Sequence, residues 1–314
     1  MAFDKARLGA QLARLAQSGV YLGTSSWKYQ GWRGLLYDDA RYMYRGKFAK
    51  SRFEDLCLAE YAEVFKAVCV DATYYTYPTV KFLNGMRAQV SDDFLFGFKV
   101  SDAITVRKFP KHPRYGGLGG KVNPHFLDAE EFTERFLSPC VTIQSNVGLI
   151  IFEFSRFYPS DFPDLPSFLA VLDPFLGALP KGWPYGIELR NKHWLTPEYF
   201  ACLAKHQLAH VFNSWTDSPP VTEQIQLPGS IPNPALVGAR FLVTPGLKYE
   251  DSVSTFEPYD QTKVVDPSAR QAGSTLIHLG RSAENRRTIV FANNRLEGNA
   301  ILTLQAMVDG AEDV

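Results

Sequence analysis

Short apolar runs alternate with helical periods along nearly the whole chain, and this alternation is the feature that most constrains the fold. Consecutive parallel strands must be joined by a crossover, usually a helix, so strands in this pattern are expected to be parallel. Eight such units predict a single TIM (β/α)₈ barrel, with an open doubly wound sheet as the alternative. The eight predicted strands are Val20–Ser25, Cys69–Ala72, Phe94–Val100, Val147–Phe154, Tyr185–Leu189, Leu208–Asn213, Ala235–Val243 and Thr288–Ala292.

Between these strands apolar residues recur at helical spacing, which predicts that most of the connecting segments are helices. An amphipathic helix carrying Leu8, Leu12 and Leu15 is expected to dock on the barrel, so residues 1–19 form this helix and residues 20–314 form the barrel domain. The segment 217–234 holds five prolines and is expected to be a loop. The other predicted helices are Phe53–Val68, Val80–Val90, Ala129–Leu137 with Asp128 as its cap, Leu165–Leu179 interrupted by Pro174, a helix capped by Thr196 that runs to Lys205, one within 259–280, and Asn299–Val308.

Charge and cysteine content narrow the class of protein. The 314 residues include 33 Lys and Arg and 33 Asp and Glu, a balance that argues against a generic polyanion binder but leaves room for a local basic pocket. Four scattered cysteines without a CxxC spacing are typical of reduced thiols in the cytoplasm. The sequence shows no secretory signal pattern and no run of 18 apolar residues, so no membrane association is expected.

Two long connections, 107–124 and 244–257, follow predicted strands. In TIM barrels the loops after the strands form the active-site face, so these long loops are expected on the C-terminal face of the barrel. Polar and aromatic residues at the same strand ends are the candidate site. We predict catalytic roles for Glu188, Glu153 and Asp71, and substrate-binding roles for Arg190, Lys99, Arg240, Asn293, Asn294, Trp27, Tyr29, Tyr75 and Trp194.

Period-two alternation supports the charged part of this site. Glu188 and Arg190 share one strand face, so Glu188 is a candidate general base and Arg190 an anion clamp; the alternative is a buried ion pair. Burial of Glu153 beside Glu188 would raise one pKa and create a proton donor, whereas the alternative is a carboxylate held by Lys99 or Arg190. Lys99 would bind an anion or neutralise an acidic neighbour.

The remaining candidates also have two interpretations. Asn293 and Asn294, with Arg240 nearby, would hold a phosphate at the last helix, or would cap that helix and close the barrel. Trp27 and Tyr29 would stack on a base or sugar, or would pack as a lid. No HxH or HExxH pattern occurs, and we predict neither a metal nor another cofactor; a Mg²⁺ site on the three candidate carboxylates is the lesser alternative.

Five segments in order resemble the YecE-like family, domain-of-unknown-function family 72. They read GTSSWKYQGWRG at 23–34, VCVDATYYTYP at 68–78, FGFKVSDAIT at 96–105, ELRNKHW at 188–194 and VFANNRLEGNA at 290–300. The resemblance covers about residues 20–308 and implies a TIM barrel, but little about function. The chain departs from the family pattern at Ser26, Cys69, Asp71, Glu153, Ser155 and Asn191, which suggests a subfamily with altered chemistry.

These observations leave three function classes open. The first is a hydrolase, phosphoesterase or nuclease-like by analogy with other barrels, that acts on an anionic substrate at the barrel mouth. The second is a carbohydrate-active enzyme with paired carboxylates. The third is a ligand-binding barrel without catalysis. The expected partner is a small anionic or phosphate-bearing ligand, with single-stranded nucleic acid as a further candidate; the sequence predicts no oligomeric state.

Overall fold

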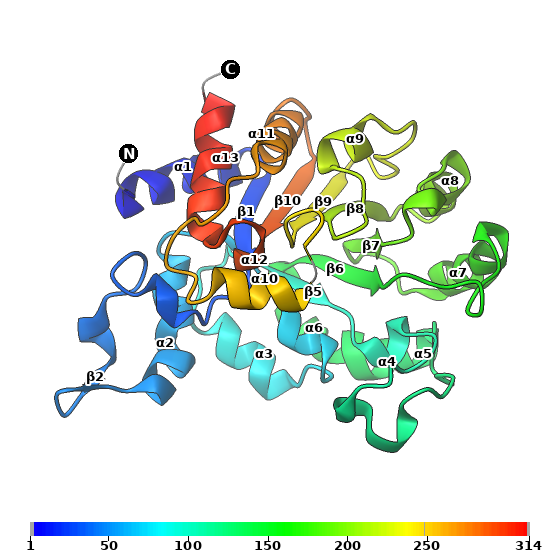
Figure 1. Cartoon of the computed structure of the whole chain (residues 1–314), viewed down its shortest axis with the longest axis horizontal. Coiled ribbons are helices and arrows are strands. Elements are labelled where there is room, and N and C mark those ends of the chain that lie inside the picture. The colour runs from blue at the N-terminus through cyan, green and yellow to red at the C-terminus, as the bar shows by residue number, and fades with distance from the viewer. Residues whose placement is uncertain (1–2, 248, 313–314) are drawn as a thin grey trace.

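Eight parallel strands close into a barrel in the computed structural model, which describes residues 3–247 and 249–312 (Figure 1). The strand order around the barrel is β1-β10-β9-β8-β7-β6-β5-β4, and β4 pairs with β1 to close it. The prediction of a TIM barrel is therefore confirmed, and the open sheet is wrong. The barrel strands are β1 Val20–Ser25, β4 Ala67–Val70, β5 Leu95–Lys99, β6 Val147–Phe154, β7 Tyr185–Leu189, β8 Ala209–Ser214, β9 Leu236–Phe241 and β10 Arg287–Ala292.

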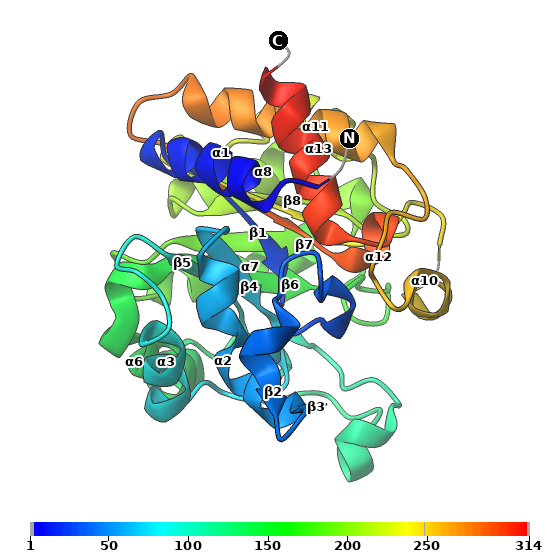
Figure 2. The same cartoon turned by 90° about the vertical axis from the view of Figure 1, so that its left-hand side faces the viewer.

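Helices surround the strands, as Figure 1 shows. A two-stranded antiparallel hairpin, β2 (Met43–Tyr44) with β3 (Lys47–Phe48), lies beside α2 in Figure 2. The helices are α1 Lys5–Gln17, α2 Lys50–Ala62, α3 Val80–Arg87, α4 Asp102–Thr105, α5 Ala129–Glu131, α6 Ser138–Cys140, α7 Leu165–Ala178, α8 Pro197–Lys205, α9 Val221–Gln226, α10 Tyr249–Phe256, α11 Pro267–Arg281, α12 Asn294–Glu297 and α13 Ala300–Glu312.

Four local predictions need correction. The helix predicted over Phe53–Val68 ends at Ala62 as α2, and strand β4 begins at Ala67. The predicted helix was too long because apolar residues that are also buried follow the end of the helix. Pro174 lies inside α7 without interrupting it. The side chain of Thr196 bonds to Glu198 and does not cap α8. The proline-rich segment 217–234 contains the short helix α9, whose ends fall between the prolines. Asp128 does cap α5, as predicted.

The barrel interior has an apolar floor beneath a charged rim. Residues that alternate along the strands form a separate interior cluster of aliphatic side chains with one phenylalanine and one cysteine. Gly97 has no Cβ, and a Cβ there would lie 2.6 Å from the ring of Phe291, so the glycine makes room for that ring. The cluster comprises Ala67, Cys69, Leu95, Leu149, Ile151, Ala209, Val211, Leu236, Ile289 and Phe291.

Helix α1 packs on the outside of the barrel through Leu8, Leu12 and Leu15, which are all buried. It lies beside α13 in Figure 2, and Arg7 pairs with Asp309 at 2.6 Å between the two helices. Among residues 3–247 and 249–312, no helix combines the length and the apolar character that crossing a membrane requires.

Candidate functional site

Six charged side chains meet at the carboxyl ends of the barrel strands, and we call them the charged cluster. Because alternate residues of a strand share one face, Lys99 of β5, Glu153 of β6 and Arg240 of β9 point inward like the interior residues two or four positions before them. The register aligns Glu153 of β6 with Glu188 of β7. The cluster consists of Asp71, Lys99, Glu153, Glu188, Arg190 and Arg240.

Glu153 lies at the centre of the charged cluster. Its Oε2 atom forms ion pairs with Lys99 Nζ at 2.6 Å, with Arg190 Nη2 at 2.8 Å and with Arg240 Nη1 at 3.1 Å. Burial raises the pKa of the Glu153 carboxyl, but the combined charges of these three cations outweigh burial and hold the pKa well below its ordinary value. This direction argues against a proton-donor role for Glu153 and favours the alternative, a carboxylate held by Lys99 and Arg190.

Glu188 is the register partner of Glu153 on the neighbouring strand and has no exposed surface. Its Oε1 accepts from Arg190 Nη2 at 3.0 Å, and its Oε2 accepts from Arg240 Nη1 at 2.7 Å. Since both carboxylate oxygens are engaged, Glu188 positions two guanidiniums rather than facing a ligand. This arrangement is the buried ion pair of the alternative interpretation.

Lys99 and Arg240 complete the cationic side of the cluster. Burial lowers the pKa of Lys99, against the opposing charge of Glu153, and the Nζ atom lies 3.6 Å from the ring centroid of Tyr74. Arg240 reaches across the barrel and donates from Nη2 to Asp71 Oδ1 at 3.0 Å. Arg240 thus links carboxylates from the ends of three strands.

Asp71 differs from the other two carboxylates in its exposure. It is the first residue after β4, and its side chain is 28% exposed, against 3% for Glu153. Oδ1 pairs with Arg240, and no residue in the described part of the chain donates to Oδ2. Asp71 is therefore the carboxylate of the cluster that is most open to a ligand or water.

A cavity of about 520 Å³ opens above the cluster, and we call it the central pocket. Its volume falls in the usual range for small-ligand sites. The charged cluster contributes every member except Glu188 to the lining. Further lining residues include Tyr74, Tyr75, Arg114, Trp215 and Asn293.

Three of these lining residues were not among the predicted site residues. Trp215 stacks on Arg190, whose Cζ lies 3.7 Å from the ring centroid. Tyr74 lies beneath Lys99, and Arg114 approaches from the long 107–124 loop, 4.7 Å above the ring of Tyr75. Tyr74 and Trp215 follow strands closely, a signal that could have identified them, whereas only the path of the loop brings Arg114 to the site.

Three predicted aromatic residues lie outside the central pocket. Trp27 lines a separate cavity of about 420 Å³ between α2 and α3. Tyr29 packs against Trp32 and Tyr259, at centroid distances of 4.8 and 5.6 Å. Trp194 stacks on Phe168 at 5.6 Å. These residues pack around the rim, and of the predicted aromatic residues Tyr75 reaches the pocket.

Asn293 and Asn294 serve mainly the backbone of the helices that follow β10. Asn293 Oδ1 accepts from the Arg295 N–H at 3.0 Å and so caps α12, although the residue also lines the central pocket. Asn294 is buried, and its Oδ1 accepts from the Ala300 N–H at 2.8 Å and from Trp32 Nε1 at 3.3 Å. The capping interpretation therefore describes Asn294.

The three carboxylates of the charged cluster were also the candidates for a Mg²⁺ site. In residues 3–247 and 249–312 there is no group of three or more His, Cys, Asp or Glu side chains arranged to hold a metal ion. The three carboxylates considered for Mg²⁺ instead share the guanidinium of Arg240.

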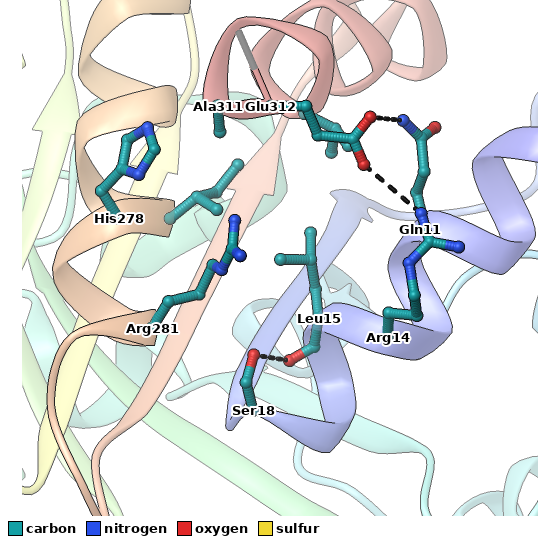
Figure 3. A pocket seen from close by; sticks show the side chains of 10 residues that line it. Gln11, Arg14, Leu15, Ser18, His278, Arg281, Ala311 and Glu312 are labelled. Carbon is teal, nitrogen blue, oxygen red and sulfur yellow. Dashed lines mark hydrogen bonds and ion pairs between the residues drawn. The ribbon is translucent and has the colours of Figure 1, made fainter. Parts of the chain in front are cut away.

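Another cavity, of about 580 Å³, lies between α1, α11 and α13 (Figure 3). Helix α1 leads into β1, and α11 leads into β10. Its polar groups pair across the helices: Gln11 Nε2 donates to Glu312 at 2.8 Å, and Arg14 pairs with the same carboxylate at 3.4 Å. Sequence patterns gave no signal for this cavity. It carries charged residues from helix surfaces but none from strand ends.

Comparison with known proteins gives the relatives of this chain. The family described as "Protein of unknown function DUF72" matches residues 21–313. The UPF0759 protein YecE of Escherichia coli is 24% identical over 182 residues, which are 58% of this chain and 50% of that protein. The chain thus spans about half the length of the curated relatives that it matches.

Two solved structures have the same fold. A DUF72 family protein of Enterococcus faecalis superposes with a TM-score of 0.62 at 19% identity, covering 93% of this chain and 95% of that one. A DUF72 family protein of Thermotoga maritima gives a TM-score of 0.57 at 19% identity, covering 94% and 98%. At these identities, the likeness shows the fold alone.

Proposed function

The chain belongs to the DUF72 family of proteins of unknown function, and from this premise we propose that its barrel mouth hydrolyses a phosphate ester, with Asp71 as the general base. The observation that supports the proposal most is the position of Asp71. Its side chain is the most exposed carboxylate of the charged cluster, and it lines the central pocket beside three fixed cations.

The cations would bind the phosphoryl group. Lys99 Nζ and the outer edge of Arg190 line the central pocket, and no described residue accepts a hydrogen bond from Arg190 Nη1. Guanidinium and ammonium groups bind phosphate oxygens through charge-assisted hydrogen bonds. Glu188 and Glu153 act as positioning residues, because they hold these cations in place before a ligand arrives.

The chemistry then requires an attacking water. A water on Asp71 Oδ2 would attack phosphorus and pass its proton to the carboxylate, while the bond to the ester oxygen breaks. Arg190 and Lys99 would balance the negative charge that grows on the phosphoryl oxygens. The departing alkoxide would take a proton from solvent.

The carbohydrate alternative finds no support in this geometry. Paired-carboxylate hydrolysis needs two carboxyl groups that both face the sugar. Glu188 has no exposed surface and both of its oxygens bind guanidiniums, so it cannot face a sugar in this arrangement. The non-catalytic alternative keeps one supporting observation, since both oxygens of Glu188 and Oε2 of Glu153 are held in ion pairs.

The test measures release of nitrophenol from p-nitrophenyl phosphate and bis(p-nitrophenyl) phosphate by the wild type, Asp71→Asn and Asp92→Asn. Asp92 provides a matched control because its side chain is 96% exposed and precedes β5, at the opposite end of the barrel. We expect Asp71→Asn to lower kcat by about 100-fold or more, a typical loss for a general base, and Asp92→Asn to leave it unchanged. Equal rates for the wild type and Asp71→Asn would refute the proposal. Phosphate binding without any turnover would favour the non-catalytic barrel.

A further inference from the structure

The central pocket continues into a second cavity, which we call the side chamber. The side chamber has a volume of about 590 Å³ and shares Tyr74, Pro110, Ser155, Arg190 and Trp215 with the central pocket. Each of the two cavities has the size of a complete small-ligand site. A ligand that fills both is therefore extended, with more than one unit.

The side chamber carries a surplus of positive charge. The charged cluster below the central pocket is balanced, with three cations and three carboxylates. In the side chamber, Arg107, Lys108 and Lys111 come from the long loop and form no ion pair with any described residue. The acidic residue that lines the chamber, Asp161, turns an oxygen to the Tyr158 N–H at 3.0 Å. The chain as a whole is neutral, so the surplus is a local feature of this chamber.

Aromatic side chains line the same chamber as these cations. Phe109, Tyr158, Tyr74 and Trp215 line the side chamber, and Tyr158 is 59% exposed. Trp215 stands where the two cavities meet, with Arg190 stacked on its ring. A cationic groove with interleaved aromatic faces is the arrangement that binds single-stranded nucleic acid, because cations follow the phosphates while unstacked bases find ring faces.

We propose that the side chamber binds nucleotides of a single-stranded nucleic acid, adjacent to the phosphodiester that occupies the central pocket. The inference rests on the proposed function and names the substrate class of the same site. Two features favour a single strand: bases must be free to stack on the aromatic residues, and Arg107, Lys108 and Lys111 offer three charges to a flexible backbone.

The first test measures binding of a fluorescein-labelled 12-mer oligothymidylate by anisotropy, in the Asp71→Asn background so that the probe is not consumed. Replacing Arg107, Lys108 and Lys111 together by Ala should weaken binding at least tenfold. It should also reduce the slope of log K against log salt by about 2, since each contact to a single-strand phosphate contributes about 0.7. The matched control replaces Lys47, Lys50 and Arg52 by Ala, which removes the same charge at the β2–β3 hairpin and the start of α2. This control should bind within twofold of its parent.

A second variant tests stacking at an exposed position, where folding is not at risk. Tyr158→Ala should weaken oligothymidylate binding about tenfold, within the range of one lost base-stacking contact. Equal binding by the loop variant and its matched control would overturn the inference. A duplex of the same length that binds as tightly as the single strand would also overturn it.

The outcomes separate this inference from the proposed function. Wild-type hydrolysis of p-nitrophenyl phosphate with no oligothymidylate binding would overturn the inference and leave the proposed function standing. Oligothymidylate binding without hydrolysis of either nitrophenyl ester would support the nucleic-acid groove and overturn the catalytic step.

Discussion

Glu188 and Arg240 form an ion pair of 2.7 Å between strands β7 and β9, and neither side chain is open to solvent. Removing one partner of such a pair leaves the other charged and buried, which costs about 3–5 kcal/mol. We therefore expect Glu188→Gln to lower the free energy of unfolding by about 3 kcal/mol or more, measured by urea denaturation. Glu54→Gln is the control, because the Glu54–Lys50 pair is exposed and its loss should change stability by less than about 1 kcal/mol. Equal effects from the two changes would show that the buried pair is not structural.

The imidazole of His210 makes stability depend on pH. His210 lies on β8, fully buried against Tyr199 and Phe200, and burial lowers its pKa to about 4. Between the ordinary pKa of about 6.5 and this value, the unfolded chain binds a proton that the folded chain rejects. The stability is therefore complete above about pH 6.5 and declines as the pH falls towards 4, by about 3 kcal/mol in total.

The test compares the wild type with His210→Phe across this pH range. Other groups titrate in both proteins, so the difference between the two curves isolates His210. We expect the wild type to lose stability relative to the variant between pH 6.5 and 4. Parallel curves would contradict the prediction.

Gly23 lies on β1 where the barrel closes against β4, and a Cβ there would approach the Ala67 carbonyl oxygen to 1.9 Å. Gly23→Ala must push the two strands apart, so we expect a loss of about 1–3 kcal/mol or more, as in other overpacked cores. Gly85→Ala is the matched change, since Gly85 lies inside α3 with open space around it. That substitution should instead stabilise the protein by about 0.5–1 kcal/mol. Urea denaturation of both variants checks the opposite signs.

Two side-chain contacts to Asp102 hold the 107–124 loop against the barrel. Arg114 Nη2 pairs with Asp102 Oδ2 at 2.6 Å, and the Tyr115 hydroxyl donates to the same oxygen at 2.8 Å. Because Arg114 is partly exposed, its pair should contribute only about 1 kcal/mol. Arg114→Ala should accelerate hydrogen exchange of the loop amides about fivefold while global unfolding changes little.

Hydrogen exchange followed by mass spectrometry measures this effect on the loop. Arg135→Ala serves as control, because Arg135 pairs with Glu131 outside the loop. If the loop amides also exchanged faster in Arg135→Ala, or exchanged no faster in Arg114→Ala, the contacts to Asp102 would not be what holds the loop against the barrel.

Sequence reasoning predicted most of the barrel because strand alternation is a local signal. Period-two patterns put Glu188 and Arg190 on one strand face and put Lys99 and Glu153 on the faces opposite their phenylalanine neighbours. The closed barrel turns the faces that carry these four residues inward. The protonation of Glu153 could not be predicted in this way. Its pKa depends on cations from β5, β9 and the end of β7, and only the closed barrel shows that all three reach the same oxygen.

For the aromatic residues, the sequence did not reveal which of them line the pocket. Trp27, Tyr29 and Trp194 follow strands in the sequence, yet they pack around the rim, while Tyr74 and Trp215 reach the pocket. Which ring turns inward depends on the course of each loop rather than on spacing. The same holds for Arg114, since a loop of this length has no period from which its contacts could be inferred.

The balanced charge of the cluster has a consequence for selectivity. Each cation of the charged cluster already has a carboxylate neighbour, so an incoming anion has to compete with a resident one. Chloride, with a single charge and no hydrogen-bonding geometry of its own, competes poorly with a carboxylate at 3 Å or less. A phosphate ester offers several acceptor oxygens, which can bind more than one cation of the cluster at once, and so can succeed. The resident carboxylates thus favour anions with several directed acceptors over the simple halide ions of the medium.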